Sequence, residues 1–179
     1  TEIELLSGSG GVKVAELRTS KTQWEGKAAI LVSLRDITPR KQTEQELREN
    51  EEELTAIYEN APLIMMLVDK ERKIRKVNRF TGRFVDLPVE EMEGKRGGEA
   101  LHCIHHLEDP RGCGFGPQCE QCTIRNAVLK TFETGRNHDH LEASLTLIRQ
   151  DQHKEYTFLL STKLLRHAEE SLVLLTVMD

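Results

Sequence analysis

Aromatic residues are scarce in this chain of 179 residues: Phe, Trp and Tyr together make up 4% of the sequence, with a single tryptophan. So few rings leave few platforms on which nucleic-acid bases or a flavin could stack. Long hydrophobic runs are also missing, and no apolar stretch approaches the roughly 20 residues that a membrane-spanning helix needs. The chain opens on a strand-like pattern and not on a signal peptide. We therefore expect a cytoplasmic protein without a membrane span.

An excess of either charge is missing as well. The formal net charge is −5, with acidic and basic residues interspersed, which does not indicate a nucleic-acid-binding surface. The sequence contains no kinase phosphate-binding loop, no phospho-acceptor region and no cyclase signature. We therefore predict that these residues do not form an enzyme.

Cysteine is rare, but its four occurrences are clustered. Residues 102–122 contain all of them, together with three of the seven histidines. The cysteines are Cys103, Cys113, Cys119 and Cys122. A soft metal or a disulfide pair explains such a cluster, whereas ordinary core packing does not. In a cytosolic protein, metal binding or redox chemistry is more common than structural disulfides.

The order of the predicted elements indicates an antiparallel α+β domain. Strand-like patterns cover residues 1–6, 12–18, 28–35, 64–68, 73–77, 141–148, 156–164 and 172–178, with a turn at 7–11 and a loop at 19–27. Short helices are expected at residues 78–84 and 89–92. A longer helix follows Cys122, where Ile124, Val128 and Phe132 give it one apolar face.

A charged helix is expected between the third and fourth strands. Thr38 is a candidate N-cap, and Pro39 suits the first helical position. The helix runs to Asn60. Its apolar positions recur with heptad spacing, at Leu47, Leu54 and Ala61 with Asn50 and Ile57 between them. This predicts a short parallel coiled coil. The alternative is a solvated helix that packs on its own domain.

The two ends of the sequence resemble each other. Residues 13–21 and 30–36 are similar to residues 158–163 and 173–179, about 142 residues further along. This distance corresponds to one module plus one linker helix. Residues 1–36 therefore look like the last strands of a preceding module.

Several short motifs resemble the PAS family of sensory domains. They are Tyr-Glu-Asn-Ala-Pro at 58–62, the strand at 64–69, Val77-Asn78, and Asp-Ile-Thr at 36–38 after a terminal strand. The resemblance implies a five-stranded antiparallel sheet with short helices and one longer helix on one face. It also implies three parts: the end of a preceding PAS module (1–36), a linker helix (37–60), and a PAS domain (61–179) with a cysteine-rich insertion (102–122).

The resemblance further implies a function and partners. Such modules occur in sensor histidine kinases and diguanylate cyclases, where they form parallel dimers and control an output domain of the same chain. Asp36 and Thr38 correspond to the signalling linker, and Asn78 could contact a pocket ligand or cap the following helix. The flavin-binding motif of light-sensing relatives is missing, and no histidine stands out as a haem ligand. Neither flavin nor haem is therefore expected.

The cysteine spacing, C-x9-C-x5-C-x2-C, is compatible with a four-thiolate site for Zn²⁺ or an iron–sulfur cluster. Cys119 and Cys122 are expected in the first turn of a helix, whose N-terminus stabilises thiolates. Glycines 112, 114 and 116 should let backbone N–H groups point at sulfur. His105 and His106, and also His102, are alternative ligands. Two other interpretations are a dimerisation scaffold with structural zinc and a thiol–disulfide protein that uses Cys119 and Cys122.

Overall fold

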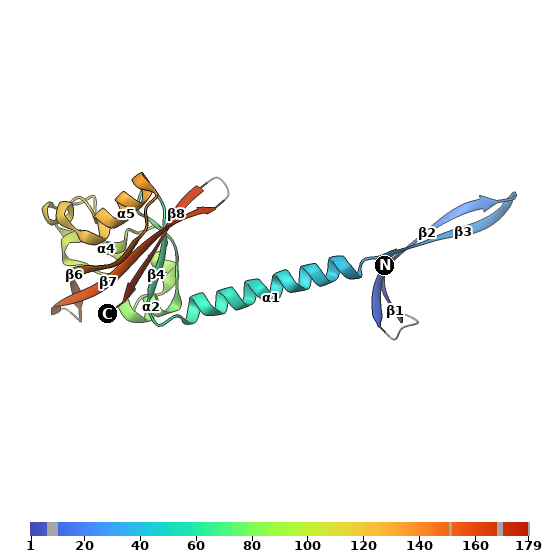
Figure 1. Ribbon diagram of the computed structural model, residues 1–179, viewed down its shortest axis with the longest axis horizontal. Helices are drawn as coiled ribbons and strands as arrows, with labels where there is room; N and C mark the ends of the chain where they lie inside the picture. Colours follow the sequence, from blue (N-terminus) through green and yellow to red (C-terminus); the bar gives the residue numbers. More distant parts are fainter. Residues whose placement is uncertain (7–10, 151, 168–169, 179) are drawn as a thin grey trace. The chain divides into compact units, whose positions relative to one another are not determined.

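The computed structural model describes residues 1–6, 11–150, 152–167 and 170–178, with the side chain of residue 167 left out (Figure 1). The chain forms two compact units, Thr1–Thr55 and Ala56–Asp179. No helix among the described residues has a segment that is both long and apolar enough to cross a membrane.

The first unit contains a three-stranded antiparallel sheet in the order β1-β2-β3, with β1 at Glu2–Leu6, β2 at Val12–Trp24 and β3 at Lys27–Asp36. The predicted loop at 19–27 is wrong, because β2 continues to Trp24 and pairs with β3 from Ala15 to Trp24. The chain reverses at Glu25 (φ 50°) and Gly26 (φ 74°). Two successive positive φ angles match the twist of a tight hairpin. The predicted turn at 7–11 lies, except for Gly11, outside the described residues.

The helix α1 (Thr38–Asn60) begins where predicted, but its cap differs. The Asp36 carboxylate accepts the Thr38 N–H at 2.9 Å. The Thr38 hydroxyl instead pairs with the backbone of Val14 in β2, accepting its N–H at 2.8 Å and donating to its carbonyl at 3.3 Å. The capping role predicted for Thr38 is therefore wrong: Asp36 provides the oxygen, and Thr38 fastens the helix start to β2.

The apolar positions of α1 are exposed. Leu47, Leu54 and Ile57 have exposed fractions of 59%, 67% and 62%, and no residue of α1 is buried. The boundary between the two compact units falls within this helix. The coiled coil stays a prediction.

The second unit is built on a five-stranded antiparallel sheet, as predicted (Figure 1). The order of its strands is β5-β4-β8-β7-β6. Its strands are β4 (Ile64–Val68), β5 (Ile74–Val77), β6 (His138–Arg149), β7 (Gln152–His167) and β8 (Glu170–Met178). Its helices are α2 (Arg79–Val85), α3 (Val89–Met92), α4 (Gly97–Ala100) and α5 (Thr123–Thr134), with short 3₁₀ helices η1 (Ile104–Leu107) and η2 (Pro117–Gln121).

The core of this unit lies between the sheet and its helices. Alternate residues of the strands are fully buried, among them Met66, Phe158, Leu160 and Val173. The longer helix α5 packs across β6, β7 and β8 and ends at Gly135 (φ 69°), as predicted. Burial of these apolar side chains is the main source of the unit's stability.

Candidate functional site

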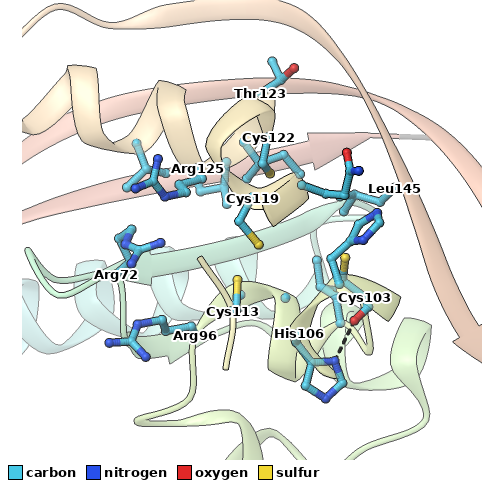
Figure 2. A pocket seen from close by; sticks show the side chains of 18 of the residues that line it. Arg72, Arg96, Cys103, His106, Cys113, Cys119, Cys122, Thr123, Arg125 and Leu145 are labelled. Carbon is cyan, nitrogen blue, oxygen red and sulfur yellow. Dashed lines mark hydrogen bonds between the residues drawn. The ribbon is translucent and has the colours of Figure 1, made fainter. Parts of the chain in front are cut away.

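All four cysteines line one cavity of about 260 Å³. Its apolar wall comes from the sheet and from α5, through side chains that include Val68, Leu145, Leu175 and Val128. His105 and His106 line it as well, whereas His102 does not. Figure 2 shows the sulfur atoms of Cys113 and Cys119 pointing toward each other. The structure thus brings together the cysteines that are up to 19 residues apart in the sequence.

Cys103 is attached to an edge strand of the sheet. Its N–H donates to the Gly98 carbonyl at 2.8 Å, and Cys103 forms an isolated bridge with Leu147 of β6. Next to it, the Ile148 N–H donates to the carbonyl of His102 at 2.8 Å. One wall of the cavity is therefore hydrogen-bonded to β6.

Cys113 is held by a carboxylate from α4. Glu99 accepts the Cys113 N–H at 3.0 Å and the Arg96 N–H at 3.1 Å, and so connects the cysteine loop to the helix start. Gly98 makes room for the thiol, because a Cβ atom there would lie 2.7 Å from the Cys113 Sγ. Only a glycine permits this close approach.

Cys119 and Cys122 lie at a junction between two helices. Cys119 belongs to η2, and Cys122 is the N-cap residue of α5. The expectation that both lie in the first turn of one helix is therefore wrong. The Gly114 N–H donates to the Cys119 Sγ at 3.3 Å, so the predicted role of a glycine N–H is confirmed there. Gly114 has φ 94°, a conformation that favours glycine.

All four cysteines are free thiols, and burial disfavours the ionisation of Cys103 and Cys113. Burial raises the pKa of Cys103 to about 11, although the His105 N–H opposes the rise. The pKa of Cys113 is also raised, again mainly by burial and against the Gly98 N–H. Among the described residues, no three Cys, His, Asp or Glu side chains meet closely enough to hold one metal ion. All four cysteines nevertheless line the same cavity.

The two histidines of the cavity have other partners. The His105 Nδ1 lies 2.6 Å from a Glu108 carboxylate oxygen, and the His106 Nδ1 lies 2.6 Å from the Cys103 carbonyl. Each ring keeps one nitrogen, Nε2, outside these contacts. His138 lies in β6, with its Nδ1 3.0 Å from the hydroxyls of Thr131 and Thr162.

Three arginines also line the cavity, and the sequence analysis missed them. Figure 2 shows Arg72, Arg96 and Arg125 on the side of Cys113 and Cys119. Arg125 lies in the first turn of α5, three residues after Cys122, and Arg96 lies seven residues before Cys103. Arg72, in the turn between β4 and β5, is far from the cysteines in the sequence. Arg72 and Arg96 also lie over the Phe115 ring, 5.8 and 4.9 Å from its centroid.

Asn78 does not line this cavity. It is fully buried and caps α2, accepting the Thr81 N–H at 3.3 Å. Its amide group also donates to backbone carbonyls at the end of α1 and before β4, those of Tyr58, Ala61 and Leu63. The capping role, one of its two expected roles, is therefore the one that the structure shows.

Comparison with known proteins finds similar folds among solved structures. No protein-family model matches the chain, and no curated protein matches it. Among solved structures, the PAS domain of an HTR-like protein from Haloarcula marismortui is similar over 78% of this chain and 98% of its own, with 19% identity and a TM-score of 0.54. The PAS domain of nitrogen regulation protein NR(II) from Vibrio parahaemolyticus matches over 70% and 95%, with 10% identity and a TM-score of 0.52.

The chain has the PAS fold. Five antiparallel strands and the order of the helices agree with the expectation from the short motifs. At these identities the likeness describes the fold alone. In this PAS fold, the cysteine segment lies between α4 and α5 and supplies one side of the cavity.

Proposed function

We propose that this chain is a sensory region in which a PAS domain holds a metal centre on Cys103, Cys113, Cys119 and Cys122 and relays the state of that centre through α1. The observation that carries the proposal is that all four cysteines line one cavity under α5. Metal ligation explains why thiols from three separate segments face the same space. The free thiols also suit the reducing cytoplasm, where we place the protein.

The surroundings of the sulfur atoms support ligation. Backbone N–H groups of Gly114, Gly98 and His105 point at Cys119, Cys113 and Cys103 in turn. Such donors stabilise thiolates, which are the forms that bind metal. Burial makes an isolated thiolate costly, and a bound cation offsets this cost.

The shape of the site favours an iron–sulfur cluster over a single zinc ion. A tetrahedral Zn²⁺ with Zn–S distances of about 2.3 Å would draw four sulfurs to one point. A [4Fe–4S] cluster binds each thiolate through a different iron atom, so its ligands surround a core of several atoms. Thiols arranged around a cavity of about 260 Å³ match the second arrangement better.

The two ends of the cysteine segment offer a route for the signal. Cys103 is bridged to β6, and Cys122 caps α5, which packs across β6, β7 and β8. A change in ligation would therefore shift α5 against the sheet. We infer that an output domain of the same chain, a kinase or a cyclase, receives this shift through helical linkers.

The linker suggests how the chain assembles. The apolar positions of α1 are exposed and have heptad spacing, which supports a parallel homodimer through this helix. The antiparallel pair β2–β3 is similar to the pair β7–β8 and is followed by Ile37 and Thr38 of the Asp-Ile-Thr motif, which supports the assignment of residues 1–36 to a preceding PAS module.

Metal analysis of the full chain, purified without oxygen, tests the proposal. We expect a brown protein with stoichiometric iron and sulfide, and loss of both in Cys103→Ser and Cys119→Ser. His105→Gln and His106→Gln serve as matched controls and should retain the metal. One colourless zinc ion per chain would support the scaffold interpretation instead. A metal-free wild-type protein whose thiols form disulfides on oxidation would overturn the metal site.

The thiol oxidoreductase interpretation has less support. Such an enzyme needs an accessible nucleophilic cysteine with a lowered pKa. Cys119 is only 6% exposed, and Cys122 is half-buried. The arrangement thus favours a sensor over an enzyme.

A further inference from the structure

Positive charge is concentrated at the cavity that holds the thiols. Arg72, Arg96 and Arg125 all line it. The Arg72 guanidinium lies against Gly114, the residue that follows Cys113. Like charges in a half-buried space repel one another. The arrangement therefore suits an anion.

Two of these arginines have unused donors. The Nε atom of Arg125 is buried without a hydrogen-bond partner, although its Nη1 donates to Asn126 at 3.1 Å. The guanidinium of Arg72 has no acceptor among the described residues, and its Nη1 lies so close to Gly114 that a Cβ there would be 2.0 Å away. The Arg125 Nε is a buried polar atom left unpaired, which costs free energy and indicates an absent acceptor there. Arg72 is only half-buried, and its guanidinium faces the same cavity.

The third arginine is occupied by the protein itself. Arg96 donates from Nε to the Glu71 carbonyl at 3.2 Å and from Nη1 to the Arg111 carbonyl at 3.2 Å. Its guanidinium also lies 4.0 Å from Glu99. Arg96 therefore organises the cysteine loop, and the free charge at the cavity belongs to the other two.

We propose that Arg72 and Arg125 are the counter-charges of a net anionic metal–thiolate centre in this cavity, and that they set its retention and its reduction potential. The inference rests on the proposed function, since the anion is the four-cysteine centre itself. Both a [4Fe–4S] cluster and Zn²⁺ carry net negative charge when four thiolates bind them. A nearby guanidinium stabilises that charge and donates to its sulfur atoms.

The proposal predicts opposite effects in the two states of the protein. In the metal-free chain, removing one arginine relieves repulsion with the other, so stability stays equal or rises. In the loaded chain, the same substitution removes an attraction. Because solvent screens a half-buried arginine, we expect the loss of this attraction to lower metal retention about tenfold. A merely structural arginine would destabilise both states.

The reduction potential gives a second signature for the iron form. A one-electron reduction by dithionite adds a negative charge to the cluster, which a guanidinium stabilises. Removing the guanidinium should therefore shift the potential in the negative direction. Arg72→Lys keeps the charge and should lie between the wild type and Arg72→Gln.

The experiment compares the full chain with Arg72→Gln, Arg72→Lys and Arg125→Gln, each reconstituted with ferrous iron and sulfide or with Zn²⁺. The matched control is Arg111→Gln: Arg111 lies over the same Phe115 ring at 4.5 Å and pairs with Asp109, but does not line the cavity. Thermal unfolding with and without metal, competition with a chelator, and potentiometric titration are measured.

We expect Arg72→Gln and Arg125→Gln to lose metal to the chelator about tenfold more readily and to unfold about 3–5 °C lower when loaded, with no loss of stability when metal-free. The control should match the wild type throughout. If the wild type binds neither iron with sulfide nor zinc, the proposed function fails and this inference with it. If the wild type binds metal but both Gln variants retain it equally well, only the role of the arginines is refuted.

Discussion

Asn78 offers the sharpest test of how the PAS unit is held together. Its side chain is fully buried and takes part in six hydrogen bonds. Asn78→Ala removes the cap of α2, which costs about 1 kcal/mol. It also leaves the carbonyls bound by the two amide hydrogens without donors, at about 1 kcal/mol for each hydrogen. We expect the free energy of unfolding of the PAS unit to fall by about 3 kcal/mol in total. The Met65 N–H adds nothing to this loss, because the Thr81 hydroxyl can still accept its hydrogen bond.

Amide hydrogen exchange measures this loss of stability in the PAS unit itself. The tryptophan, Trp24, lies in the other compact unit and reports on that unit. Peptides from β4 and β8 should exchange about a hundredfold faster in Asn78→Ala. The control is Asn60→Ala, since Asn60 is exposed and donates only to the Ala56 carbonyl. Equal exchange in Asn78→Ala and Asn60→Ala would refute the assigned role of Asn78.

Three further predictions concern the cysteine loop and the linker. Gly98→Ala should lower metal retention, because the new Cβ atom would lie 2.7 Å from the Cys113 Sγ. The control is Gly97→Ala, whose Cβ atom would meet no other atom within 4 Å, and its metal content should equal that of the wild type. The Thr38 hydroxyl and N–H lower the pKa of Asp36 to about 2, which carboxyl NMR titration can check. The ionised Asp36 therefore stabilises the folded chain fully above its ordinary pKa near 3.8, and this contribution falls as the pH drops toward 2. The same pH dependence should disappear in Asp36→Asn. Leu47→Glu and Leu54→Glu should dissociate the dimer in analytical ultracentrifugation, while Glu51→Gln should not, and a wild-type monomer would contradict the coiled coil.

The order of the elements was predictable from the sequence because strands and α5 carry clear hydrophobic periods. Alternating Leu and Ala residues indicated β6, and Ile124 and Val128 indicated the buried face of α5. The second half of β2 was missed because Thr19 to Trp24 carries no apolar alternation, and its pairing with β3 maintains the strand. Local pattern alone does not contain such pairing.

The cysteines were predictable as a cluster, but their surroundings were not. Proximity in sequence marked residues 102–122, and the glycines near Cys113 indicated a tight backbone. Arg72 lies about 30 residues earlier, and only the packing of the β4–β5 turn against Gly114 brings it to the cavity. Tertiary contacts of this kind leave no periodic signal in the sequence.

The strand β4 gives the proposed sensor a short physical route. Its last residue, Val68, lines the cavity, and Arg72 follows in the next turn. Near its first residue, the Met65 N–H donates to Asn78, which also binds the carbonyl of Tyr58 at the end of α1. Because β4 is paired on both edges, by β5 and β8, it can shift only together with these neighbours. The strand β4 thus connects the cavity, at Val68, with the last turn of the linker helix, which Asn78 contacts at Tyr58.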